Sequence, residues 1–244
     1  MAGLLLLLTW QVYAVLGPLG GDVLPAPTQV MRAGWADRAS LARNTLPTMV
    51  VVLAGFAASV TVAFVLSLII DRWRLARSAL LPLLIGSQTL PIIVLAPLMT
   101  LWFGFGLPPK VLLVALVTFF PIVVGLLDGY SASDRDASAL LRTMGAGWWQ
   151  EFRLVRLPSA LPSFFTGLRI SVTYAVVAAI FAEYAGAERG LARYLQTAQN
   201  SYRPDLVLAA VTVTALLTLL LFAMATAAQR LTVPWHFAAH RLPR

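Results

Sequence analysis

Long stretches without a charged side chain are the feature that most constrains how this sequence can fold. Asn44–Ile70, Ser78–Pro109 and Leu206–Gln229 contain no charged residue, and Met1–Gly21 and Val111–Leu127 are charge-free in the same way. An α-helix rises about 1.5 Å per residue, so about 20 residues cross a bilayer core about 30 Å thick. Because an isolated strand cannot satisfy its backbone hydrogen bonds in lipid, we expect these stretches to be transmembrane helices.

The overall composition agrees with a lipid-embedded chain. Hydrophobic residues make up 59% of the 244 residues and charged residues only 11%, against about 45–50% and about 25% in soluble domains. This contrast excludes intrinsic disorder, a nucleic-acid-binding domain and most classes of soluble enzyme. The absence of cysteine excludes disulfides, iron–sulfur clusters and thiolate metal sites.

We therefore predict an all-α membrane protein that forms a single domain over residues 1–244. The six expected spans are Gly3–Leu19, Met49–Ile70, Leu84–Phe105, Val111–Leu127, Phe164–Tyr184 and Leu206–Ala228. The first could instead be a secretory signal. It has no Lys or Arg before it and no convincing small-residue cleavage site before Asp22, so we favour a retained helix.

The distribution of basic residues predicts the orientation of the chain. Of 18 Arg and Lys residues, 11 fall on the side of the bilayer that would hold both termini and the loop Ser131–Leu157, and seven fall on the other side. Basic residues are enriched in cytoplasmic loops, so we expect both termini and this loop in the cytoplasm. On the outer side, Val30–Leu46 suits an interfacial helix and Gly186–Asp205 a short amphipathic helix.

The cytoplasmic loop has an unusual apolar pattern. Ser133 and Asp136 fit a capping box that starts a helix at about Asp134. Gly145 and Gly147 should end that helix, and Pro158 should end a second one. One apolar stripe would run along this loop, formed by Ala137, Leu140, Leu141, Met144 and Trp148, and the second helix would carry Trp148, Trp149, Phe152 and Val155.

Two interpretations of this loop remain open on physical grounds. It could be an amphipathic hairpin that lies on the lipid surface or packs under its own helices. It could also be a docking site that presents Trp and Phe side chains to a soluble partner.

Sequence motifs in the loop resemble those of a known family. Leu141-Arg142-Thr143-Met144-Gly145-Ala146, followed by Val155-Arg156-Leu157-Pro158, resembles the EAA loop of permease subunits of binding-protein-dependent ABC importers. Ala139-Leu140-Leu141 stands in the place of the family's Glu-Ala-Ala, and this departure leaves the apolar docking surface in place. Pro91–Leu98, Leu101–Gly106 and Ala182–Ala192 resemble the same family.

The resemblance covers nearly the whole chain, from Leu24 to Trp235, and is closest to the nitrate, sulfonate and taurine branch. Within that branch the ending Val233-Pro234-Trp235 and the run Leu141–Gly145 resemble permeases for thiamine pyrimidine precursors. It implies a type I ABC importer permease fold (MetI-like) in a bacterial plasma membrane, with a cytoplasmic coupling loop over about residues 129–160. The alternative solutes are a sulfonate, taurine, nitrate or riboflavin.

The resemblance also implies partners. They are a second copy or a similar permease, cytoplasmic ATP-binding subunits and an extracytoplasmic solute-binding protein, with membrane lipid around them and no nucleic acid. No G-x-x-x-x-G-K-[ST] motif is present, so this chain is expected to be a non-enzymatic transport subunit without a cofactor of its own, and ATP and Mg²⁺ would bind the partner ATPase. The residues implied in ATPase coupling are Leu140, Leu141, Arg142, Met144, Gly145, Ala146, Trp148, Trp149, Phe152, Val155, Leu157 and Pro158.

Polar residues inside the spans are candidates for lining a solute pathway, because burying them in lipid is costly. They are Gln88, Thr89, Thr118, Tyr174 and Glu183. Ser and Thr more often hydrogen-bond within their own helix, and Tyr is more often a core or interface anchor. Glu183 could line or gate the pathway, or it could be an interfacial acid paired with Arg189 or Arg193, which we favour slightly.

Functions of other classes have weaker support in the sequence. The only two histidines, His236 and His240, lie in the C-terminal tail without a nearby third ligand, so we interpret them as part of a solvated basic tail rather than a metal site. A membrane enzyme would need clustered catalytic groups in its spans. A channel or scaffold would not need the Trp-rich cytoplasmic loop.

Overall fold

The computed structural model describes residues 2–17 and 24–235, and every element in this part of the chain is a helix. The all-α prediction is therefore confirmed. In chain order, the elements are α1 Ala2–Leu16, α2 Pro27–Ala36, α3 Arg38–Arg72, α4 Arg74–Ser87, α5 Ile92–Phe103, α6 Leu107–Ser131, α7 Arg135–Thr143, α8 Trp148–Glu151, the π-helix η1 Phe152–Arg156, α9 Leu157–Tyr184, α10 Leu191–Asn200 and α11 Pro204–Thr232.

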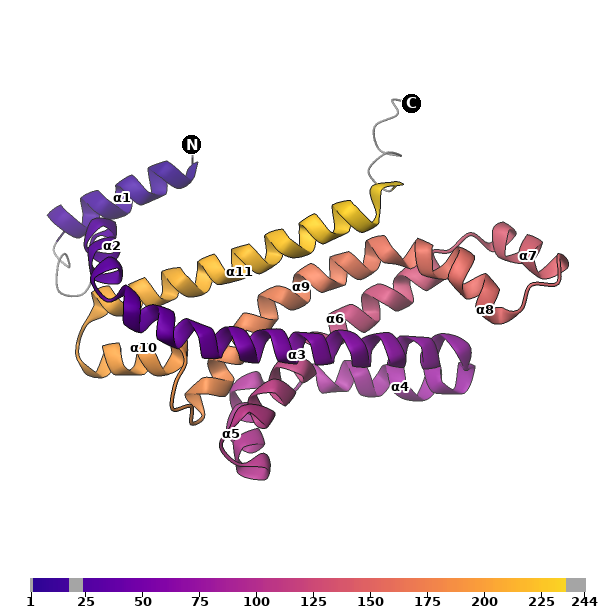
Figure 1. The fold of residues 1–244 in the computed structure, drawn as a ribbon, viewed down its shortest axis with the longest axis horizontal. Coiled ribbons are helices and arrows are strands. Elements are labelled where there is room, and N and C mark those ends of the chain that lie inside the picture. Colours follow the sequence, from indigo (N-terminus) through magenta and orange to yellow (C-terminus); the bar gives the residue numbers. More distant parts are fainter. Residues whose placement is uncertain (1, 18–23, 236–244) are drawn as a thin grey trace.

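Four long helices, α3, α6, α9 and α11, form the body of the molecule (Figure 1). Within the described residues, these four are apolar and long enough to cross a membrane, and α9 does so together with α8 and η1 as one run, Trp148–Tyr184. A fifth span exists only if α4 and α5 are counted together as one bent span. The structure thus supports four or five spans in this part of the chain rather than the six expected.

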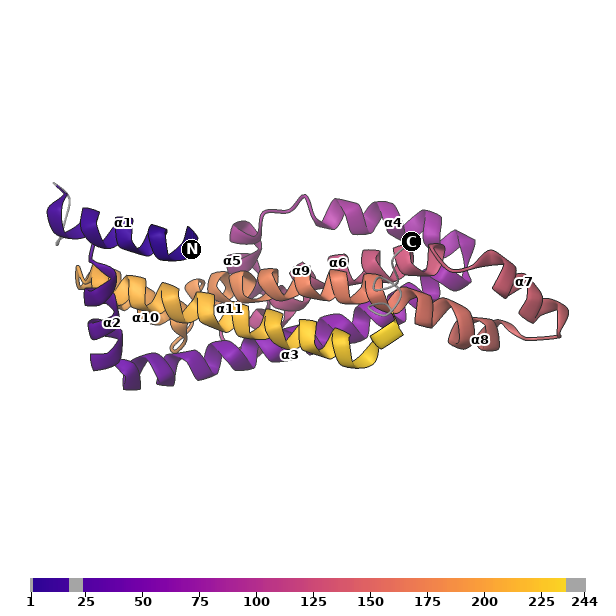
Figure 2. The same cartoon turned by 90° about the horizontal axis from the view of Figure 1, so that it is seen from above.

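The first expected span, Gly3–Leu19, is not confirmed. Helix α1 has 15 residues, fewer than the roughly 20 that cross a bilayer core, and Pro18 and Leu19 lie outside the described residues. In both views α1 lies at the α10 end of the bundle, opposite α7 and α8 (Figures 1 and 2).

The third expected span, Leu84–Phe105, is wrong as one continuous helix. Helix α4 ends at Ser87, α5 begins at Ile92, and the two axes meet at 101°. Pro91 is the N-cap of α5. Because proline has no N–H and its ring disfavours the helical conformation at the preceding residue, α4 cannot continue through this position.

Among the described helices, α6 and α9 make the most extensive contact, and small residues line it. A Cβ on Gly167 of α9 would lie 2.3 Å from the carbonyl oxygen of Pro121, and a Cβ on Gly129 of α6 would lie 2.4 Å from Cα of Ala160. The hydroxyl of Ser171 donates to the carbonyl oxygen of Thr118 across the same contact, at 2.6 Å. Residues 132–156 connect these two helices, and Thr118, Tyr174 and Glu183 lie on them.

The end of the bundle opposite α7 and α8 carries the expected amphipathic helix. α10 buries the four residues expected to form its apolar face, Leu191, Tyr194, Leu195 and Ala198. The other expected segment, Val30–Leu46, is not a single interfacial helix. It is divided at Asp37, so that α2 crosses the end of the bundle while the remaining residues begin the long helix α3 (Figure 1).

Candidate functional site

The loop after α6 projects from one end of the bundle as two short helices (Figure 1). Asp134 is the N-cap of α7, and its Oδ1 accepts hydrogen bonds from the backbone N–H groups of Asp136 and Ala137, at 2.8 and 3.2 Å. The expected cap, Ser133, instead donates its hydroxyl to the carbonyl oxygen of Tyr130. A carboxylate is the better cap here because it satisfies two N–H groups at the positive end of the helix dipole.

Glycine ends α7 where the sequence predicted it would. Gly145 has φ +84°, a conformation that side-chain-bearing residues rarely adopt, and the backbone then turns before α8 begins at Trp148.

The second helix does not end at Pro158, contrary to expectation. α8 continues through η1 into α9, and the N–H of Leu157 donates to the carbonyl oxygen of Phe152, five residues earlier. The wider π-helical turn shifts the hydrogen-bonding register just before Pro158, which has no N–H to donate. The loop is therefore joined to the long helix α9 without a flexible break.

A row of alternating charges ties the loop together and to α3. The guanidinium of Arg142 on α7 makes two hydrogen bonds to the carboxylate of Glu151 on α8, at 2.8 and 2.9 Å. Arg156 lies 3.7 Å from Glu151 and also forms an ion pair with Asp71 at the end of α3. The bidentate contact with Glu151 raises the pKa of Arg142, mainly through the hydrogen bonds.

Stacked aromatic rings form the inner side of the loop. The ring of Phe152 stacks on those of Trp148 and Trp149, with centroids 5.4 and 5.6 Å apart, and meets Tyr130 edge-on at 5.4 Å. The guanidinium of Arg72 lies over Trp148 at 5.7 Å. Phe152 is only 1% exposed, so it anchors the loop on α6 and cannot be presented to a partner as expected.

The other expected coupling residues differ in exposure. Leu140, Met144 and Trp149 expose 63%, 75% and 58% of their surface, an unusually large apolar area for a polar loop. Arg142 and Gly145 are exposed as well, while the half-buried members are Leu141, Ala146, Trp148, Val155, Leu157 and Pro158. Leu154, which is 62% exposed, was missed because its position in a π-helix breaks the expected helical spacing. Contact of these residues with a partner stays a prediction.

Two of the expected pathway residues come together beside the α4–α5 break. Gln88 and Tyr174 line one cavity of about 210 Å³, together with Ser87, Leu95 and Val117. No charged residue lines this cavity. Thr89 lies in the same break but donates its hydroxyl to the carbonyl oxygen of Gly86 and does not line the cavity.

Thr118 does not line a pathway. It is fully buried, and its hydroxyl donates to the carbonyl oxygen of Val114 at 2.7 Å, within its own helix. The sequence signal, a threonine in an apolar span, is produced equally by this local hydrogen bond.

Glu183 has a structural role at the α10 end of the bundle, away from the α7–α8 loop. It borders a cavity of about 450 Å³, yet it is only 2% exposed. Oε1 accepts from the hydroxyl of Thr48 at 2.6 Å, and Oε2 from the backbone N–H of Ala192 at 3.0 Å. It forms no ion pair with Arg189 or Arg193 among the described residues, so the pairing that we favoured is not found, while a pathway role stays a prediction.

Glu183 is one of three side chains that cap α10. The N–H of Gly190 donates to Oδ1 of Asn44, that of Leu191 to Oγ1 of Thr48, and that of Ala192 to Glu183. The first N–H groups of a helix need acceptors, and a carboxylate is favoured at this end by the helix dipole. Sequence reasoning missed this function, although Gly190 next to the helix start was a usable signal.

Comparison with known proteins assigns the family. The model of the family described as "Binding-protein-dependent transport system inner membrane component" matches residues 59–235. The chain belongs to this family. It is thus a multi-pass membrane protein and a subunit of an ABC transporter, as the loop motif indicated.

Relatives of the chain are named for the transport of several different solutes. It is 36% identical over 95% of its length to the formylaminopyrimidine transport permease protein ThiX of Halalkalibacterium halodurans, with 93% of that protein covered. It is 34% identical to the riboflavin transport system permease protein RibX of Chloroflexus aurantiacus (95% and 87% covered) and 30% identical to the taurine transport system permease protein TauC of Escherichia coli (95% and 86%). These relatives match the suspected branch.

A solved structure supports the fold independently of sequence similarity. The crystal structure of an amino acid ABC transporter with histidines aligns with a TM-score of 0.67 and 15% identity, over 82% of this chain and 97% of that one. At this identity the likeness concerns the fold alone.

The two histidines that we interpreted as part of a solvated tail, His236 and His240, lie outside the described residues.

Proposed function

We propose that this chain is the permease subunit of an ATP-driven importer that moves a thiamine pyrimidine precursor across a bacterial inner membrane. In this assembly the chain forms a single permease domain with both termini and the loop of residues 129–160 in the cytoplasm. It provides half of a pathway that is completed by a second copy or by a similar permease.

The exposed apolar face of the α7–α8 loop is the observation that carries the coupling part of this proposal. Leu140, Met144 and Trp149 point into solvent from two helices that Arg142 and Glu151 clamp together. A lipid-lying hairpin would need no such clamp. A partner ATPase that closes on binding ATP and Mg²⁺ can push on a rigid projection, and the continuous helix into α9 carries that displacement into the membrane.

The uncharged cavity beside Gln88 supports a neutral, planar solute. The Gln88 amide offers donors and acceptors of the kind that pair with a pyrimidine, and the Tyr174 ring can stack on it. One relative is named for formylaminopyrimidine transport. Other relatives are named for riboflavin and taurine, so these solutes are the competing substrates. An anionic sulfonate would lack a basic partner in this cavity.

Uptake into proteoliposomes tests both parts of the proposal. The chain is co-expressed with its ATPase and solute-binding protein, and ATP-dependent uptake of formylaminopyrimidine, riboflavin and taurine is compared. We expect formylaminopyrimidine to be transported, and Gln88→Ala to lower its uptake about tenfold, the loss typical of one good hydrogen bond to a substrate. Thr89→Ala, one residue away and outside the cavity, is the matched control.

Site-specific cross-linking tests the coupling partner directly. A photoreactive residue at position 149 should trap the ATPase, whereas one at Tyr202, at the opposite end of the molecule, should not. If only lipid is trapped at position 149, the loop is not a docking site, and a channel or scaffold becomes the better explanation.

A further inference from the structure

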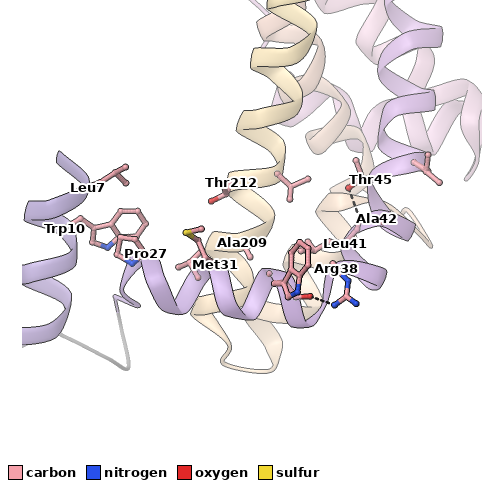
Figure 3. Close-up of a pocket in the computed structure, with 15 residues that line it drawn as sticks. Leu7, Trp10, Pro27, Met31, Arg38, Leu41, Ala42, Thr45, Ala209 and Thr212 are labelled. Carbon is pink, nitrogen blue, oxygen red and sulfur yellow. Dashed lines mark hydrogen bonds between the residues drawn. The ribbon is translucent and has the colours of Figure 1, made fainter. Parts of the chain in front are cut away.

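An apolar groove lies at the end of the bundle away from the α7–α8 loop. Its volume is about 690 Å³, and its walls come from α1, α2, α3 and α11. In Figure 3, Leu7 and Trp10 of α1 lie on one side and Arg38, Ala42 and Thr45 on the other, with Met31, Ala209 and Thr212 between them. This volume falls within the roughly 300–1,000 Å³ of sites that bind small molecules.

The groove opens onto the outer surface of the molecule, where the transmembrane helices would face lipid. Met31, Trp35, Ala42 and Leu46 line it, and all four are exposed. The charge-free stretch of α3 begins at Asn44, so the groove spans the level at which polar side chains give way to apolar ones. That level is the boundary between headgroups and acyl chains, where Trp residues are enriched.

Two hydrogen-bond donors in the groove are not fully used. The guanidinium of Arg38 donates to the carbonyl oxygen of Trp35 at 2.9 Å and lies over the Trp35 ring at 5.1 Å. None of the ion pairs among the described residues includes Arg38. The indole N–H of Trp10 is buried and has no acceptor there.

Arg38 is the only charged residue among the described residues that line the groove. Arg32 and Arg43 are also exposed and lie before and after Arg38 in the sequence, on α2 and α3. The nearest carboxylate in sequence, that of Asp37, accepts the hydroxyl of Tyr194 on α10 at 2.6 Å. An anion in the groove would therefore meet the guanidinium of Arg38, with no carboxylate among the described lining residues.

We infer that this groove binds an anionic phospholipid. One acyl chain lies along the apolar walls, and the phosphate meets Arg38, which can offer further N–H donors in a planar fork. Charge complementarity selects this occupant over a second copy of the chain, since the described lining of the groove presents Arg38, which is in no ion pair, and no carboxylate.

Native mass spectrometry of the purified transporter tests this inference without relying on transport. The delipidated complex is titrated with phosphatidylglycerol or with phosphatidylcholine of the same acyl chains. We expect phosphatidylglycerol to bind more tightly, and Arg38→Gln to weaken its binding about tenfold while leaving phosphatidylcholine unchanged. Arg193→Gln, an exposed arginine of α10 at the same end of the bundle, is the matched control and should have no effect.

A second variant tests the apolar part of the site. Ala42→Trp places a large side chain in the groove from an exposed position, which the fold should tolerate, and we expect it to weaken binding of both lipids. Equal affinity for the two lipids, or phosphatidylglycerol binding that neither Arg38→Gln nor Ala42→Trp changes, would overturn the inference. So would loss of the dimer in Ala42→Trp without loss of lipid, since a second copy would then be the occupant.

Discussion

The carboxylate of Glu183 occupies the space that a side chain on Gly190 would need. A Cβ built on Gly190 would lie 2.3 to 2.5 Å from the carboxyl carbon and both carboxylate oxygens, and Gly190 has φ +141°. The glycine and the glutamate therefore form one unit, in which the missing side chain lets a buried carboxylate reach the N-terminus of α10.

Replacing Gly190 should break this unit. We expect Gly190→Ala to destabilise the protein by about 1–3 kcal/mol, because it combines backbone strain with displacement of a buried capping group. Thermal unfolding of the detergent-solubilised protein measures the effect. Gly86→Ala is the control: its added Cβ meets no atom within 4 Å, and it should be neutral or stabilising by up to about 1 kcal/mol. Equal stability of Gly190→Ala and the wild type would contradict the close contact.

The pair of Arg142 and Glu151 should control coupling rather than membrane insertion. We expect Arg142→Gln to lower ATP-dependent uptake several-fold with normal expression, because α7 would no longer be held against α8. The charge-swapped double variant, Arg142→Glu with Glu151→Arg, should recover part of the loss. Uptake and ATPase activity are measured in proteoliposomes, and wild-type uptake by Arg142→Gln would show that the clamp is not needed.

An exposed tryptophan should be essential to the proposed contact with the ATPase. We expect Trp149→Asp to lower stimulated transport by at least about tenfold while leaving the chain inserted, because a buried charge in an apolar contact costs several kcal/mol. Co-purification of the ATPase should fall in parallel. Tyr202→Asp, at a position 92% exposed at the opposite end, should behave as the wild type.

Close packing of α6 and α9 should not tolerate a larger residue at Gly167. We expect Gly167→Val to destabilise the protein by about 1–3 kcal/mol, because its Cβ would press on the Pro121 carbonyl. Gly147 has a negative φ and no atom within 4 Å of an added Cβ, so Gly147→Ala should leave the unfolding temperature unchanged. A normal unfolding temperature for Gly167→Val would mean that the two helices can separate freely.

The contact between Tyr194 and Asp37 should make stability depend on pH. Hydrogen bonds from Ser40 and then Tyr194 hold the pKa of Asp37 below its ordinary value of 3.8. The stabilisation is present above that value and is lost as pH falls through the lower, folded-state pKa. We expect Tyr194→Phe to unfold at a lower temperature than wild type at about pH 6, with the difference shrinking at about pH 3. A constant difference between these pH values would exclude Asp37 as the cause.

The sequence alone determined the properties that depend on local pattern. Charge-free stretches determined that the chain is helical and lies in lipid, because lipid solvates neither charges nor free backbone groups. The spacing of glycines and apolar residues predicted the hairpin at Gly145 and the buried face of α10. The family motif lies in the same kind of short, contiguous segment, which is why the amino-acid sequence was enough to suggest the family.

Only the tertiary structure decided which polar residues face a cavity and which serve the fold. Thr118 and Glu183 have the sequence pattern of pathway residues. The hydroxyl of Thr118 bonds one turn away in its own helix, whereas Glu183 accepts from Thr48, which is 135 residues away in the chain. Pro91 and Pro158 look alike in sequence, yet one caps the start of a new helix after a break and the other is accommodated next to a π-helical turn. A buried polar group takes whichever partner the packed helices bring to it, and that choice is made by long-range packing rather than by its neighbours in sequence.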